Sequence, residues 1–264
     1  MALLVLAACG GDRPEDAVRE ADHLFGQGHW EEAAAAYASL PPEVGRWRAY
    51  GAWRAAVVYR DGLQDLPRAR EAFEACAKTW ADDEWGYTCQ VDLADLLRDS
   101  GEPRDAIGAY RTAVEMRPNG AHLQQCLLSS GRAYLTLGQP EQARVEWEEL
   151  LQRFPTSAHA PIVALEMARS FDLQGDHKGA LAAYQDVQDR FSTHSVAPLA
   201  AFGEGEALEQ LGRLEEAEAK FVAAMEVHPN PGAVQIKLDS VRERRQRREQ
   251  DESSVMDHGV KLNR

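Results

Sequence analysis

His122 and Cys126 are the pair of residues that comes closest to a reactive site in this 264-residue sequence. They lie four apart, so on a helix they share one face, and imidazole and thiolate are both zinc ligands. Two ligands are too few for a zinc site and no others converge on them, so we interpret them as packing or surface residues. The signatures HExxH, CxxC, GxxxxGK and GxSxG are absent. We therefore expect no metal, no cofactor and no enzymatic activity.

Cys9 ends a second motif that has chemistry of its own. Residues 6–9 read Leu-Ala-Ala-Cys after a short apolar run, which matches the bacterial lipobox. In that motif the signal is cut before the cysteine, which then carries the acyl chains that anchor the protein. Gly10 follows where an aspartate would retain such a protein in the inner membrane of enterobacteria, so we expect the outer membrane, facing the periplasm. No Lys or Arg precedes the run, and the alternative is an apolar N-terminus of a cytosolic protein.

The composition predicts a helical protein with an acidic surface. Hydrophobic residues make up 44% of the chain, alanine is abundant, and no run of alternating β-branched residues predicts a strand. The net charge is -14, which disfavours nucleic acid as a partner because phosphate backbones are repelled. No segment is long enough to cross a membrane as a helix, so membrane attachment would depend on the N-terminal lipid alone.

The sequence repeats itself with a period of 37 residues. A first series of small residues comprises Ala69, Ala106, Ala143, Ala180 and Ala217. Four places later come the aromatic residues Phe73, Tyr110, Trp147, Tyr184 and Phe221. Glycine recurs at Gly101, Gly138, Gly175 and Gly212, and a second small series comprises Ala94, Gly131, Ala168 and Gly205. Several series in one register indicate stacked structural repeats.

Each repeat predicts two helices joined by a tight turn. The recurring glycine follows the first helix, where a left-handed cap favours it, and a proline such as Pro118 or Pro155 ends the second. These features resemble the tetratricopeptide repeat family, most closely in residues 212–229, although the usual unit is about 34 residues. The resemblance implies an all-α, right-handed α-solenoid of about six helix pairs. It also implies a scaffold that binds other proteins.

We expect the six helix pairs to occupy residues 14–232, after an N-terminal signal and tether at 1–13. A capping helix is predicted at 233–250, because Val234, Leu238 and Val241 form one apolar stripe at helical spacing. Five arginines follow within residues 242–248. This basic run could bind an anionic partner, or it is a solvated helix end before a disordered tail at 251–264.

The resemblance also implies positions for a disulfide and for a partner. Cys76 in the second helix of unit two would face Cys89 in the first helix of unit three, which makes them a candidate disulfide in an oxidising compartment. Three small buried hydrophobic residues, with Cys126, are the alternative. The family lines its concave groove with the first helix of each pair. The candidate groove residues are Leu128, Arg132, Leu135, Leu165, Arg169, Asp172, Leu173, Phe202 and Glu206.

Residues 153–171 are similar to two groups of bacterial envelope proteins. One group comprises the tetratricopeptide lipoproteins that help assemble outer-membrane β-barrels. The other is the periplasmic repeat protein associated with the Tol-Pal system of cell division. The expectation is a non-catalytic, lipid-anchored periplasmic adaptor in envelope assembly or cell division. The alternative is a cytosolic scaffold without a lipid.

Overall fold

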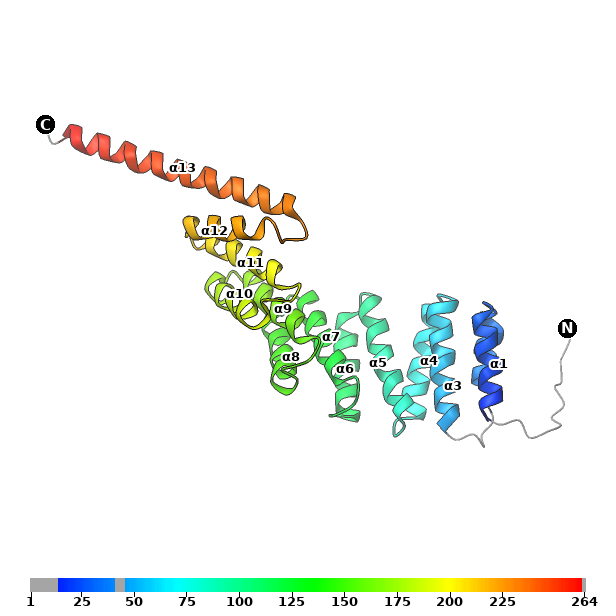
Figure 1. Cartoon of the computed structure of the whole chain (residues 1–264). Helices are drawn as coiled ribbons and strands as arrows, with labels where there is room; N and C mark the ends of the chain where they lie inside the picture. The colour runs from blue at the N-terminus through cyan, green and yellow to red at the C-terminus, as the bar shows by residue number, and fades with distance from the viewer. Residues whose placement is uncertain (1–13, 41–45, 263–264) are drawn as a thin grey trace, which may run out of the picture. The chain divides into compact units, whose positions relative to one another are not determined.

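The computed structural model describes residues 14–40 and 46–262, and the lipobox with Cys9 lies outside them. The described residues form helices and turns without a strand (Figure 1). They divide into two compact units at Ala133, within the helix α7 (Leu123–Thr136). The predicted all-α repeat class, with six helix pairs and a C-terminal helix, is confirmed.

The first unit holds the first three helix pairs and most of α7, and from α1 to α6 each helix packs against the next along the chain. Its helices are α1 (Pro14–Gly26), α2 (Trp30–Ala38), α3 (Arg46–Val57), α4 (Leu66–Thr79), α5 (Glu84–Asp99) and α6 (Pro103–Met116). A π-helical turn (Val58–Gly62) extends α3. It lies in the second repeat, which is one residue longer than the period of 37, since Ala56 and Ala94 are 38 residues apart.

The second unit continues the pairing from the end of α7, again with each helix packed on its neighbour. Its helices are α8 (Pro140–Arg153), α9 (Ala160–Leu173), α10 (His177–Phe191), α11 (Ala197–Gln210), α12 (Leu214–Ala224) and α13 (Pro231–Leu262). One core cluster runs from α9 through α13, so the last helix covers the apolar face that α11 and α12 would otherwise expose.

The repeated glycines and small residues have the structural roles expected of them. Gly101, Gly138, Gly175 and Gly212 have φ between 69° and 79°, the left-handed conformation that ends a helix without strain in glycine. At Gly205 a side chain would place its Cβ 2.7 Å from the Phe221 ring, which is too close. The small residue therefore lets the two helices of a pair approach across the buried aromatic ring.

The prediction that the last helix ends at 250 is wrong, because α13 continues to Leu262. No proline or glycine interrupts residues 233–258, so nothing stops the helix before Gly259. Pairs of opposite charge four residues apart, such as Glu243 and Arg247, support its exposed part. The predicted stripe of Val234, Leu238 and Val241 is buried, as expected of a cap.

The basic run of α13 binds acidic side chains of the preceding helix pair. Arg242 Nε lies 2.8 Å from Oε1 of Glu218 on α12, and Arg245 donates to the other oxygen of the same carboxylate. Arg244 Nη1 lies 2.7 Å from Glu209 Oε1 on α11. The sequence left two roles open for these arginines, a solvated helix end or a site for an anionic partner. In the structure they help to hold α13 on the rest of the second unit.

Candidate protein-binding site

The groove residues expected from the sequence are divided between the two units. Leu128 and Arg132 belong to the first unit, and the other seven belong to the second. Leu128 is 7% exposed and Leu165 is 0% exposed, so the expectation that these leucines line an open groove is wrong. Leu165 packs into the core cluster of the second unit. An aliphatic side chain of this size fits wholly between neighbouring helices, and its burial is favourable.

The charged residues of the expected groove lie nearer the surface. Arg132 and Arg169 are both exposed. Asp172 is partly buried, and its Oδ1 lies 3.3 Å from Nδ1 of His177 at the start of α10. A role for these residues in binding stays a prediction.

The four remaining groove residues differ in exposure. Leu173 is 72% exposed, and together with Leu135 it lines a surface hollow of about 400 Å³ in the second unit. Phe202 is partly buried against the core of that unit. Glu206 is bound at 2.9 Å by Lys237 of α13, so it also helps to hold the cap. Leu173 is therefore the most accessible apolar residue of the expected groove in the second unit.

The first unit carries an aromatic surface that the sequence analysis missed. We call it the tryptophan face: Trp47, Tyr50 and Trp53 of α3 with Trp85 of α5. The residues on α3 are three apart, so they lie along one side of the helix. The Trp53 and Trp85 rings stack with centroids 4.8 Å apart, and Tyr50 meets Trp85 edge-on at 4.9 Å. Trp47 meets Tyr50 edge-on at 5.7 Å, and all four side chains are partly exposed.

Polar contacts fix the orientation of this face. The Trp53 indole Nε1 donates to Asp92 Oδ2 on α5 at 2.6 Å. Arg60 Nη1 reaches the other oxygen of Asp92 at 3.4 Å, and its Nε lies 2.7 Å from Asp61 Oδ1. Because an indole N–H needs a partner when it is partly buried, this bond holds the ring in one rotamer. The stacked rings are thus preorganised before any partner arrives.

Arg54 joins the tryptophan face to the first helix pair. Its guanidinium lies 4.6 Å from the Phe25 ring and 5.0 Å from the Tyr37 ring, which is cation–π range. Arg54 Nη2 also donates to the Tyr37 hydroxyl at 2.9 Å, and that hydroxyl donates to Asp22. Burial, with the carboxylate beside it, raises the pKa of Tyr37 well above its ordinary value. The tyrosine therefore remains a neutral donor that links α1, α2 and α3.

A disulfide joins α4 to α5, the helix that carries Trp85. Cys76 of α4 and Cys89 of α5 are bonded, with their Cα atoms 6.0 Å apart, and this is the pair expected from the resemblance. Between them the chain turns tightly, since a Cβ at Gly86 would lie 1.8 Å from the Trp80 carbonyl oxygen. Cys126 is free and buried. The disulfide and the glycine together hold Trp85 at the start of α5.

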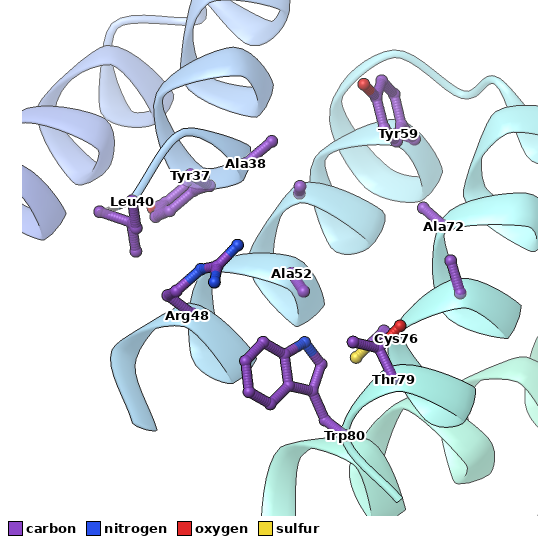
Figure 2. Close-up of a pocket in the computed structure, with 12 residues that line it drawn as sticks. Tyr37, Ala38, Leu40, Arg48, Ala52, Tyr59, Ala72, Cys76, Thr79 and Trp80 are labelled. Carbon is purple, nitrogen blue, oxygen red and sulfur yellow. The ribbon is translucent and has the colours of Figure 1, made fainter. Parts of the chain in front are cut away.

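A pocket of about 270 Å³ opens on the other side of α3, between α2 and α4 (Figure 2). Ala52 and Ala55 of α3 line it on one side. Tyr37 of α2 and Leu40, which follows α2, line it on another. Arg48 lies at one end with its guanidinium 5.8 Å from the Trp80 ring. At 100° per residue, the set of Trp47, Tyr50 and Trp53 is centred on the side of α3 opposite the centre of these alanines. One helix thus presents two surfaces of different character.

The described residues offer no sign of metal or membrane chemistry. They contain no group of three or more His, Cys, Asp and Glu side chains that could hold a metal ion. None of the helices in the described ranges is both long and apolar enough to cross a bilayer.

The sequence matches one family model, that of the tetratricopeptide repeat. It aligns with residues 91–158, 128–194 and 165–233, which together cover more than half of the chain. No curated protein sequence matches the chain.

Several solved structures share the fold. A tetratricopeptide repeat protein from Parabacteroides merdae is 12% identical, with 86% of this chain and 98% of that chain covered and a TM-score of 0.57. PilW, a type IV pilus biogenesis factor, is 15% identical, with 88% and 99% covered and a TM-score of 0.58. YrrB, described as having an unusual peptide-binding site, is 13% identical, with 73% and 93% covered and a TM-score of 0.55. At these identities the likeness shows the fold alone.

Proposed function

The chain belongs to the tetratricopeptide repeat family, whose members are generally non-catalytic scaffolds for other proteins, and we propose that it binds its partner through the tryptophan face. The observation that carries this proposal is the stack of Trp53 on Trp85, flanked by Tyr50 and Trp47. Tryptophan and tyrosine dominate the energetics of protein interfaces, because they bury a large area at low cost in side-chain entropy. Four such rings held in place on the surface form a ready anchor site.

We further propose that the scaffold works in the bacterial envelope, anchored by lipid at Cys9 to the outer membrane and facing the periplasm. The lipobox is the main support. The bonded pair of Cys76 and Cys89 agrees with this placement, since structural disulfides persist in oxidising compartments. PilW, a type IV pilus biogenesis factor, has the same fold. Envelope assembly and cell division are the two processes that the resemblance of residues 153–171 suggests.

The binding proposal is tested by replacing Trp53 and Trp85 with the residues that later repeats have at the equivalent positions. One and two periods after Trp85 come His122 and His159, and the position of Trp53 corresponds to Leu165. The double variant Trp53→Leu with Trp85→His should therefore fold while losing the stacked rings. Partners captured from solubilised envelopes by the wild type would be identified and their affinities measured. Loss of two such anchors should weaken binding at least about 30-fold.

The control variant is Arg132→Glu with Arg169→Glu, which changes the groove expected from the sequence and leaves the tryptophan face intact. Helical circular dichroism should be the same for both variants and the wild type. If the arginine variant loses the partner and the tryptophan variant retains it, the partner binds the other surface and the tryptophan face is not the site.

The envelope proposal has a separate test. Radiolabelled palmitate should enter the wild-type chain in bacteria and should not enter Cys9→Ala, because the thiol of that cysteine is the acceptor. A wild type that takes up no label would rule out the lipoprotein and leave a cytosolic scaffold. Finding barrel-assembly or Tol-Pal proteins among the captured partners would identify the process.

A further inference from the structure

The pocket between α2 and α4 is a narrow apolar trough. Its residues recur at helical spacing from Arg48 through Ala52 and Ala55 of α3 to Tyr59 of the π-helical turn, so the floor runs along this continuous helix. At 1.5 Å per residue this floor is about 16 Å long. Alanines on α2, α3 and α4 line much of the trough, which keeps it smooth and open (Figure 2). The shape fits a long, thin ligand.

The lining of the trough favours an aliphatic chain over a peptide backbone. A peptide laid along the floor would bring an amide N–H and a carbonyl every 3.3 Å or so, and each needs a hydrogen-bond partner when it leaves water. Along their length the helices around the trough use their own backbone groups internally, and free N–H and C=O groups occur only at the helix ends. The side-chain polar groups of the lining are those of Arg48, Thr79, Trp80 and the two tyrosines, and the Tyr37 hydroxyl already bonds Asp22. An aliphatic chain makes no such demand.

The charge of the trough is confined to one end. Arg48 lies in the first turn of α3, and its guanidinium rests over Trp80 without a carboxylate partner among the residues that the structure describes. In the same unit Arg54, Arg60, Arg68, Arg70 and Arg98 all bind carboxylates. The positive end of the α3 dipole adds to the attraction for an anion there, whereas α4 ends nearby at Thr79. An anion should therefore bind on the α3 side of Trp80.

We propose that this trough binds a long-chain carboxylate, with the aliphatic chain along the alanine floor and the carboxylate on Arg48. The site lies on the side of α3 opposite the tryptophan face. Its occupation and the binding of a partner protein are therefore separate properties, and either proposal can fail without the other.

Isothermal titration of the full chain with octanoate, decanoate and dodecanoate, each below its micelle concentration, tests the site. One equivalent should bind. Each added methylene should tighten binding about fourfold, because moving one methylene out of water contributes about 0.8 kcal/mol to the binding free energy. The methyl ester of dodecanoate, which lacks the charge, should bind more weakly than dodecanoate itself.

Two variants with matched controls locate the ligand. Ala72→Leu places three extra carbons in the trough and should weaken dodecanoate binding about 60-fold, by the same fourfold per carbon. Ala182→Leu, at an exposed alanine of α10, should bind like the wild type. Arg48→Gln should weaken binding up to about fivefold, as for a single exposed ion pair, whereas Arg104→Gln on the surface of α6 should not.

The pattern of results decides the question. Binding by the wild type and by Trp53→Leu with Trp85→His, together with loss in Ala72→Leu, supports the trough. The proposal is overturned if no saturable binding occurs, if affinity is independent of chain length, or if Ala72→Leu binds like Ala182→Leu. It is also overturned if a short peptide ending in a phenylalanine carboxylate displaces dodecanoate and binds more tightly, because the occupant would then be a protein chain end.

Discussion

Reduction of the bond between Cys76 and Cys89 should destabilise the first unit by about 3 kcal/mol. The two cysteines are 13 residues apart, and closing a loop of roughly that length in the unfolded chain removes about 3 kcal/mol of chain entropy. Both side chains are almost fully buried, at 2% and 0% exposed, in the core cluster that joins α3 through α7. The reduced thiols stay in that core, so the loss should come mainly from the unfolded state.

Tryptophan fluorescence during urea unfolding is a selective assay for this effect. Five of the six tryptophans lie between residues 30 and 85, within the first unit, and Trp147 lies in the second. With a denaturant dependence of about 2 kcal/mol per molar, a loss of 3 kcal/mol should lower the midpoint by about 1.5 M urea. The shift should appear on addition of dithiothreitol.

Two variants make the measurement specific. Cys76→Ala with Cys89→Ala should unfold near the midpoint of the reduced wild type and should not respond to reductant. Cys126→Ala removes the free thiol and should keep the full response to reductant. If the wild type unfolds at the same urea concentration with and without dithiothreitol, the pair is not bonded in solution and the reasoning from loop closure does not apply.

Three further predictions concern single residues. Gly205→Ala should cost about 1–3 kcal/mol by urea unfolding, because the new Cβ would lie 2.7 Å from the Phe221 ring, and a loss no larger than a few tenths would contradict that packing. Glu218→Gln should destabilise the second unit by about 1 kcal/mol at pH 7. Two arginines of α13 lower the pKa of Glu218, so the wild type should show its whole stability advantage over Glu218→Gln above pH 4.5 and lose it as the pH falls from there through the lowered pKa. An advantage that is unchanged at pH 3 would contradict the ion pairs. Burial raises the pKa of Glu146 from 4.5 to about 7, so the wild type should lose stability relative to Glu146→Gln as the pH rises from 4.5 to 7, and parallel stability curves would refute this.

The core of the fold could be predicted from the sequence because every repeat solves the same steric problem. Gly101 and Gly175 adopt the same left-handed turn, and buried aromatic rings such as Trp147 and Phe221 fill the same gap in successive pairs. Such constraints recur at a fixed spacing and so are visible in one sequence. The end of α13 was not predictable in this way, because it belongs to no repeat and depends on the absence of a stop signal before Gly259.

The candidate site could not be predicted as well, because a repeat position fixes where a side chain starts and not whether it is covered. Leu128 and Leu165 were placed in the groove by their repeat position, yet they are small enough to be buried there. Charged residues such as Asp172 and Glu206 were expected to face a partner, but they bind His177 and Lys237 within the chain. Exposure depends on neighbouring helices, which a repeat pattern does not describe.

Trp53 shows both that a repeat position can be predicted and that its exposure cannot. Counting back from Phe202 in steps of 37 residues leads to Leu165, Leu128 and Val91, and one more step, with the extra residue of the second repeat, leads to Trp53. The aliphatic residues at this position are buried, whereas the tryptophan is too large to fit and remains partly exposed. It stacks on Trp85, where later repeats have histidine or valine. The second and third repeats thus carry tryptophans where other repeats have smaller side chains, and the fold is kept while this one surface is changed. A functional surface in a repeat protein is therefore best sought where one unit departs from its own pattern.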